Sequence, residues 1–165
     1  MELIIISTGQ TMYEGEFRNL HSNTSLPQQL SVELLASLGA APILEGPQAT
    51  GGTVYQYSQR SGVEEIDGQW FTKYILGPVF TTRAATDTEA AQTAAEQEVA
   101  YKAQKDAEQA VSVRVSRATK LAETDWRFRS DMTPSQAWID YCQALRDVSA
   151  QAGFPWTVEW PVAPV

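Results

Sequence analysis

The sequence predicts an α+β chain with a small β-rich N-terminal domain, a long alanine-rich helix, a short C-terminal helix and an extended tail. Two β-prone runs flank the dipeptide Asp67-Gly68, the stretch Thr86–Glu123 contains neither glycine nor proline, and tryptophan and proline gather near the C-terminus. These features predict a β-rich head over residues 1–83, a long helix over 84–124 that could act as an oligomerisation stalk, and a C-terminal segment over 125–165.

The head is expected to contain a strand, a short helix and a β-hairpin. Leu3–Ile6 is a short apolar run typical of a first strand. Ser31 is a good N-cap and Gly39 a good C-terminal stop, which together predict a short helix between them. Thr53–Tyr57 is rich in β-formers. Asp67-Gly68 predicts a tight hairpin turn, because a type I′ turn needs positive φ at both central residues.

The long helix is predicted from its composition of alanine, glutamate, glutamine and lysine, which are strong helix formers. Thr86 and Glu89 have the spacing of a capping box, so we expect the helix to begin there. Val111–Ser116 alternates like a strand, but helix formers flank it and we expect it to be helical. Alanine buries little apolar surface, so this helix should need neighbouring helices, most simply copies of itself in a coiled-coil-like bundle.

The C-terminal helix has its own start and stop signals. Thr133 is expected as the N-cap, with Pro134 at the first helical position and Gln136 at the third. Apolar residues then follow at helical spacing, and Gly153 is expected to end the helix. The tail from Phe154 onward is expected to be extended, because prolines disfavour helix both at their own positions and at the preceding residue.

The charge balance argues against several classes of partner and site. The chain has 20 acidic and 12 basic residues and a formal charge of -8, which repels nucleic acid and anionic membranes. Arg114, Arg117 and Lys120 share a helical face, but this small basic group does not outweigh the acidic total. One cysteine and one histidine leave no disulfide and no recognisable metal set, so we expect no cofactor and no metal. The apolar N-terminal run is too short for a signal peptide or a membrane span.

No arrangement of residues points to catalysis, and we expect the chain not to be an enzyme. His21 lies in a polar stretch and is expected at the surface, and Cys142 falls on the apolar stripe of the last helix as a small buried hydrophobe. A wall hydrolase carried by a phage tail would need paired carboxylates or a metal cluster. The sequence offers neither in a recognisable spacing.

Four of the five tryptophans lie between residues 126 and 160, and large rings often anchor interfaces. They could equally pack on one another as a small core, and both interpretations can hold together. The candidate partner-binding residues are therefore aromatic residues and one proline of this segment: Trp126, Trp138, Tyr141, Phe154, Trp156, Trp160 and Pro161.

The C-terminal segment resembles the tail assembly chaperones and tail-fibre assembly proteins of tailed bacteriophages. The residues that carry this resemblance are Leu121, Thr124-Asp125-Trp126, Asp131, Trp138, Tyr141, Leu145-Arg146-Asp147, Gly153-Phe154-Pro155 and Trp160-Pro161. A looser likeness to small phage tail proteins rests on Arg18, Asn23-Thr24-Ser25-Leu26-Pro27, the run ending at Gly39, and Asp67-Gly68-Gln69-Trp70.

The resemblance implies a protein that helps a tail or tail fibre to assemble by binding other proteins, without enzyme activity or a cofactor. Its partner would be a phage tail-fibre protein or another tail protein, in a homo-oligomer or hetero-complex, and it would act in the host cytoplasm during assembly or stay on the virion tail. The alternative is a permanent structural component of the virion, such as a tail-fibre segment or a fibre-to-baseplate adaptor.

Overall fold

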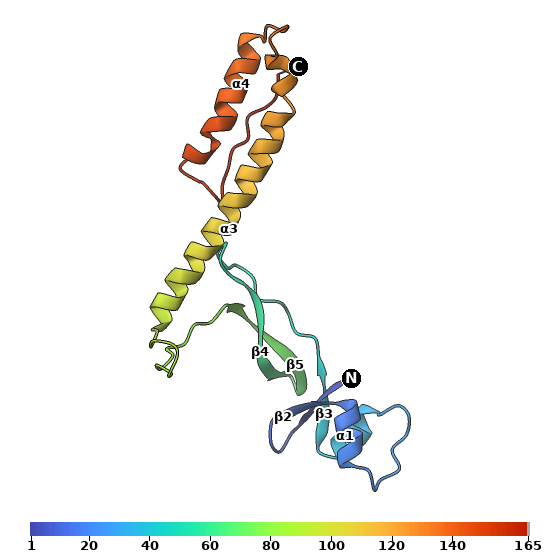
Figure 1. The fold of residues 1–165 in the computed structure, drawn as a ribbon. Coiled ribbons are helices and arrows are strands. Elements are labelled where there is room, and N and C mark those ends of the chain that lie inside the picture. Colours follow the sequence, from blue (N-terminus) through green and yellow to red (C-terminus); the bar gives the residue numbers. More distant parts are fainter. Residues whose placement is uncertain (165) are drawn as a thin grey trace. The chain divides into compact units, whose positions relative to one another are not determined.

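The computed structural model describes residues 1–164 and divides the chain into two compact units, Met1–Val79 and Phe80–Val165. We call them the N-terminal unit and the C-terminal unit. The first contains a five-stranded sheet with two short helices, and the second contains the long helix and a shorter one (Figure 1). The α+β fold expected from the sequence is therefore confirmed.

The sheet of the N-terminal unit has the strand order β2-β1-β3-β5-β4. The central strand β3 runs antiparallel to β1 and parallel to β5, while β2 and β4 form the two edges as antiparallel neighbours of β1 and β5. The strands are β1 (Glu2–Ile5), β2 (Gln10–Tyr13), β3 (Ala40–Leu44), β4 (Tyr57–Ile66) and β5 (Gln69–Gly77). The predicted first strand is thus present and begins one residue earlier than expected.

The hairpin predicted at Asp67-Gly68 joins β4 to β5. Both turn residues have positive φ, 50° and 77°, as a two-residue turn of this kind requires. The strand predicted over Thr53–Tyr57 is wrong for all but its last residue. Residues 53–56 form a turn instead. The backbone N–H of Gln56 donates to the Thr53 carbonyl at 3.0 Å, and the side-chain oxygen of Gln56 accepts from the Thr53 N–H at 3.1 Å.

Two short helices, α1 (Glu14–Leu20) and α2 (Val32–Ser37), contribute to the core of the N-terminal unit. The buried core residues come from three strands and both helices: Leu3, Met12, Phe17, Leu35 and Ala40. The predicted cap of α2 is confirmed, because the Ser31 hydroxyl accepts from the Leu34 N–H at 3.2 Å. Gly39 follows that helix with a φ of 73°, a left-handed conformation that favours glycine.

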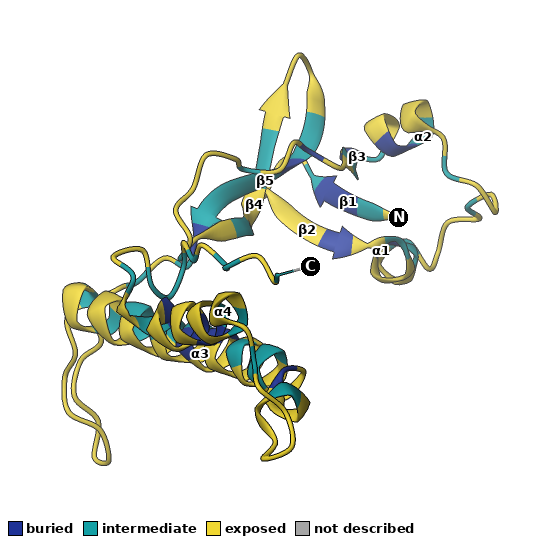
Figure 2. Cartoon of the chain, turned by 90° about the horizontal axis from the view of Figure 1, so that it is seen from above, coloured by how far each residue is buried: buried dark blue, intermediate teal, exposed yellow. Residues whose placement is uncertain are grey.

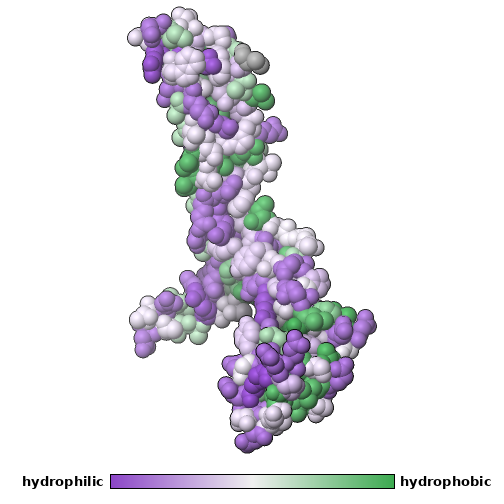
Figure 3. All heavy atoms as spheres, turned by 90° about the vertical axis from the view of Figure 1, so that its right-hand side faces the viewer, coloured by the Kyte–Doolittle hydropathy of each residue, from purple (hydrophilic) through white to green (hydrophobic). Residues whose placement is uncertain are grey.

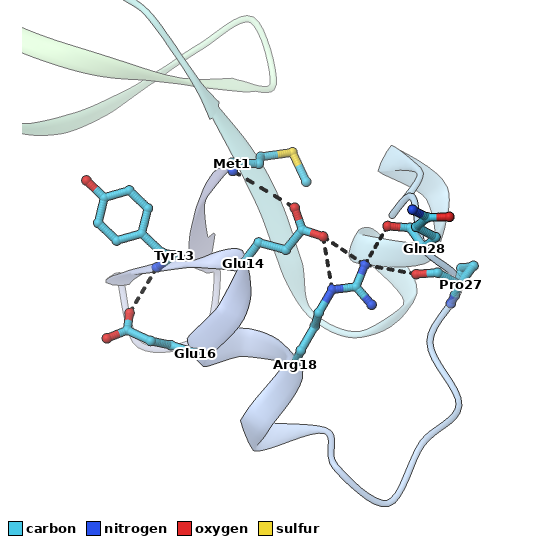
Figure 4. A network of polar contacts seen from close by, with 7 residues as sticks. All are labelled: Met1, Tyr13, Glu14, Glu16, Arg18, Pro27 and Gln28. Carbon is cyan, nitrogen blue, oxygen red and sulfur yellow. Dashed lines mark hydrogen bonds and ion pairs between the residues drawn. The ribbon is translucent and has the colours of Figure 1, made fainter.

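The Arg18 guanidinium of α1 forms hydrogen bonds with the loop that leads to α2 (Figure 4). Arg18 donates to the Glu14 carboxylate at 2.7 Å and to the backbone carbonyls of Pro27 and Gln28 at 2.9 and 2.8 Å. The same carboxylate lies 3.9 Å from the N-terminal amino group of Met1. The residues of the looser sequence likeness around Arg18 and Pro27 thus take part in a local clamp that orders the loop.

The C-terminal unit is built on α3 (Ala94–Ala122) and α4 (Gln136–Asp147), with one 3-10 turn between the helices (η1, Asp125–Phe128) and another directly after α4 (η2, Val148–Ala150). Val111–Ser116 is helical, as expected, despite its alternating pattern. In Figure 2 the buried residues of this unit gather where α3 and α4 face each other, whereas their outer surfaces are exposed. The alanine-rich helix therefore packs on a helix of its own chain.

The predicted start of the long helix at Thr86 is wrong by several residues. Thr93 is the N-cap, and its side chain and that of Glu96 form the capping box: the Glu96 N–H donates to the Thr93 hydroxyl at 3.2 Å, and the Thr93 N–H donates to the Glu96 carboxylate at 2.8 Å. Residues 84–92 form a loop instead. Arg83 and Gln92 close that loop with two backbone hydrogen bonds of 2.8 and 3.0 Å, which a continuous helix would not allow.

The shorter helix also differs from its predicted bounds. Ser135, not Thr133, is the N-cap, and its side chain makes no capping hydrogen bond. The helix ends at Asp147 and passes into η2, so it stops before Gly153. Among residues 1–164, no helix has both the length and the apolar character that a membrane crossing requires.

Candidate protein-binding site

The hairpin of α3 and α4 has a small, well-defined core. Val113 of α3 and Cys142, Leu145 and Val148 from α4 and the turn that follows it are buried. Thr124, just after α3, is buried too: its hydroxyl donates to the Leu121 carbonyl at 2.6 Å and lies 3.3 Å from the Cys142 sulfur. The expectation that Cys142 serves as a small buried hydrophobe is confirmed, since only 2% of it is exposed.

The C-terminal segment after η2 turns back and runs along α3 in the same direction as that helix (Figure 1). The Arg114 guanidinium lies over the Phe154 ring, 5.6 Å from the centroid of that ring. Trp156 donates its indole N–H to the Asp106 carboxylate at 2.5 Å, and the Trp160 ring lies 5.5 Å from the Lys120 ammonium. Three aromatic side chains therefore hold the tail against α3, and each of them contacts a charged side chain of that helix.

Gly153 makes the reversal of the chain sterically feasible. A Cβ atom at this position would lie 2.3 Å from the Thr157 carbonyl oxygen, closer than atoms can approach. The Thr157 N–H donates to the Gly153 carbonyl at 2.7 Å, so the backbone closes tightly on itself here. Two residues earlier, the Gln151 side-chain amide pairs with Glu159, donating to its carbonyl and accepting from its N–H, both at 2.8 Å.

A second aromatic group surrounds the connection between α3 and α4. The Arg127 guanidinium lies 3.7 Å from the ring centroid of Trp138 and 4.3 Å from that of Trp126. Tyr141 meets Trp138 edge-to-face at a centroid distance of 5.7 Å. One arginine thus orders two tryptophans through its contacts with their faces.

The seven aromatic and proline positions proposed from the sequence consequently fall into two places. Trp126, Trp138 and Tyr141 lie together at the connection, whereas the four tail positions, Phe154, Trp156, Trp160 and Pro161, are half-buried in the segment that returns along α3. Trp126 is the most open of the tryptophans, with 46% of its surface exposed. Sequence reasoning missed three exposed apolar neighbours of this region: Phe128, Met132 and Ile139.

One face of α3 carries apolar residues that the described part of the chain leaves open. Val111 and Val115 are 57% and 60% exposed, and Ala118 and Ala122 are exposed at the positions that continue the same helical face. Figure 3 shows hydrophobic groups among hydrophilic ones on the surface of this unit. The valines at alternate positions 111, 113 and 115 could have predicted this open apolar face, because a helix with such a pattern must present apolar groups on more than one face.

Basic residues are used differently in the two parts of the chain. Ion pairs are found in the part of the chain before residue 109, as in Arg18–Glu14 and Lys105–Glu108. After that point four basic side chains contact rings or a hydroxyl: Arg114, Lys120 and Arg127 lie over aromatic rings, and Arg117 donates to the Ser149 hydroxyl at 3.1 Å. The basic face considered in the sequence for nucleic acid thus serves to hold the C-terminal segment.

The remaining candidates have structural roles. His21 is half-buried rather than fully at the surface, and its ring lies 4.6 Å from that of Phe17. No group of three or more His, Cys, Asp or Glu side chains within residues 1–164 is placed to hold a metal ion.

At the start of α3, hydrogen bonds from the backbone N–H and the hydroxyl of Thr93 lower the pKa of the Glu96 carboxyl.

Comparison with known proteins gives a match to a protein family. Residues 110–165 match the family described as phage tail assembly chaperone protein. Neither the curated proteins nor the solved structures contain a significant match. The matched residues comprise the second half of α3, the connection, α4 and the tail, and they include the contacts of Arg114 with Phe154 and of Lys120 with Trp160. The resemblance to phage tail assembly chaperones expected from the sequence is therefore confirmed over residues 110–165.

Proposed function

We propose that this chain is an assembly chaperone that binds a phage tail-fibre protein or another tail protein while the tail is built. The family match over residues 110–165 is the observation that supports it most directly. That segment is not an isolated motif, because its helices share a buried core and its tail contacts α3 within one compact unit. The protein would act in the host cytoplasm by binding, not by catalysis.

The exposed residues of the α3–α4 connection are the proposed primary contact. Four large apolar side chains there are 40–46% exposed: Trp126, Phe128, Met132 and Ile139. Exposed large apolar groups held on an ordered framework are typical of protein-binding surfaces, and tryptophan is prominent among the residues that contribute most to binding. Arg127 holds the Trp126 ring in place from one side, which lowers the entropy that binding would cost.

The open face of α3 is the proposed second contact. Val111, Val115 and the alanines that follow them present small apolar side chains that another helix could approach closely. The partner helix would come from the tail protein or from a sister copy of this chain. The two contacts together would hold an unassembled tail protein until it finds its place.

Co-expression with each tail protein of the same phage, followed by size-exclusion chromatography with mass measurement, tests the proposal. We expect one tail protein to elute with this chain as a defined complex. Replacing Trp126 and Ile139 with Ala should weaken that complex at least tenfold, while replacing the exposed Val32 of the N-terminal unit should not. If no tail protein forms a complex, the proposed function is wrong.

A second measurement distinguishes a transient chaperone from a permanent component of the virion. Mass spectrometry of purified particles detects the full-length chain at a fixed ratio to tail proteins if it is a structural part. A transient chaperone would be present in the infected cell and depleted from purified particles.

A further inference from the structure

The C-terminal tail covers a face of α3 in a way that resembles a bound peptide more than a continuation of the fold. Beyond Thr157, its backbone is held among the described residues by the Gln151 side chain, which makes both hydrogen bonds with Glu159. A neighbouring β-strand would offer Glu159 the same pair of bonds. The other attachments are side-chain contacts of the tail rings.

These attachments are weaker than those that hold α4. Leu145 and Val148 are completely buried and Cys142 nearly so, whereas Phe154, Trp156 and Trp160 remain half-exposed. Segments with few buried contacts and exposed backbone open locally at lower free energy than the core around them. The tail can therefore leave α3 while the α3–α4 hairpin stays folded.

Removing the tail would uncover a surface with a distinct chemistry. Arg114 and Lys120 would lose their rings, and neither forms an ion pair with a carboxylate among the described residues. The Asp106 carboxylate would lose the indole N–H of Trp156. The uncovered face thus offers two cations for aromatic rings and one acceptor for an N–H donor, in a row along one helix.

We propose that this face of α3 is a binding surface for an extended, proline-containing segment of a tail protein with aromatic side chains, and that the chain's own residues 154–161 occupy this surface until such a segment displaces them. The present occupant defines the chemistry, because its rings at 154, 156 and 160 fit the three polar groups of α3. This inference rests on the proposed function and adds the kind of segment that the chaperone captures.

Binding of a fluorescent synthetic peptide of residues 154–164 to the full-length chain tests this surface. In the Trp160→Ala variant the attached tail loses the ring over Lys120, so the free peptide should bind at least tenfold more tightly than it binds the wild-type chain. Trp160→Phe keeps a ring over Lys120 and should stay near wild type. Val162→Ala changes a side chain that is 90% exposed and should have no effect.

Hydrogen exchange of the wild-type chain supplies a second readout that needs no variant. The Glu159 amide, protected by Gln151, should exchange at least tenfold faster than the buried Leu145 amide of α4. Equal protection of the two amides, or equal peptide affinity in wild type and Trp160→Ala, would overturn the proposal that the tail is displaced from this surface. A variant that dimerises by exchanging tails would identify a second copy as the occupant and would contradict a tail-protein ligand. None of these results depends on whether a tail protein co-elutes with the chain, so the binding surface on α3 and the proposed function are tested separately.

Discussion

Trp156 donates its indole N–H to the carboxylate of Asp106, a residue 50 positions earlier in the chain. This bond joins the C-terminal tail to the first half of α3, upstream of the residues that match the chaperone family. It also makes the tail part of the C-terminal unit rather than a free extension. Trp156 therefore has an internal role that must be separated from any role in binding.

Replacing Trp156 with Phe should lower the free energy of unfolding by about 1 kcal/mol, because the ring is largely kept while a hydrogen bond to a charged group in a partly exposed place is lost. Urea unfolding followed by circular dichroism at 222 nm measures this change. Asp106→Asn keeps an acceptor at the same place and should cost less. An unfolding curve of Trp156→Phe identical to wild type would mean that the bond contributes nothing in solution.

Gly153→Ala should destabilise the C-terminal unit by at least about 2 kcal/mol, because the added methyl group would overlap the Thr157 carbonyl and force the turn open. Gly15→Ala is the matched control, since a Cβ at that position in α1 meets nothing within 4 Å. It should be neutral or stabilising by about 0.5 kcal/mol, as alanine favours helix over glycine. Thermal unfolding of both variants checks the difference; similar melting temperatures would contradict the steric explanation.

Leu145→Ala should cost about 2–4 kcal/mol, because Leu145 is completely buried between the helices and its removal leaves a cavity. Val115→Ala removes apolar surface from the open face of α3 and should stay within about 0.5 kcal/mol of wild type in the isolated chain. The free energy of unfolding in urea distinguishes the two. A large loss for Val115→Ala would show that its face is already covered in solution, for instance by another copy.

The first turn of α3 should loosen in acid. Hydrogen bonds from the Thr93 N–H and hydroxyl lower the pKa of Glu96 below its ordinary value of 4.5, so the folded helix favours the ionised carboxylate. That stabilisation is fully present above the ordinary value and is lost as the pH falls through the lower pKa of the folded state. Glu96→Gln should remove this pH dependence from the amide chemical shifts of residues 93–97, followed by NMR. An unchanged acid transition in the variant would assign it to another group.

Local signals predicted much of the fold. Asp67-Gly68 identified the β4–β5 hairpin, because few residues accept positive φ at both turn positions. Ser31 identified the start of α2 through its cap. The helix formers around Val111–Ser116 outweighed its alternating pattern, since a lone alternating run inside a helix has no strand to pair with. In these cases the deciding interactions lie within a few residues of one another.

The predictions failed where two sites in the sequence have the same local signal and a contact between distant residues decides which of them is used. Thr86-Glu89 and Thr93-Glu96 have the same capping spacing, and both threonine hydroxyls accept a hydrogen bond from the later N–H, at 3.1 and 3.2 Å. The Arg83–Gln92 bridge selects the second as the helix start, and it cannot be read from propensity. β2, α1 and β3 were not predicted either, because they are short and their register depends on the sheet.

The candidate site was predicted by residue type but not by arrangement. The aromatic residues were singled out, yet their division between the connection and the tail depends on contacts across long stretches of chain, such as Arg127 with Trp138 and Lys120 with Trp160. The exposed Phe128, Met132 and Ile139 lacked a distinguishing pattern in the sequence, because apolar residues in a helix or connection are more often buried.

The central claim is that residues of the C-terminal unit receive the partner. Hydrogen–deuterium exchange of the free chain and of its complex with the co-purified tail protein tests it most directly. The account predicts slower exchange on binding within residues 110–164, at the connection and along α3, with the sheet of residues 1–79 unchanged. Protection confined to residues 1–79, with the C-terminal unit exchanging as in the free chain, would contradict it.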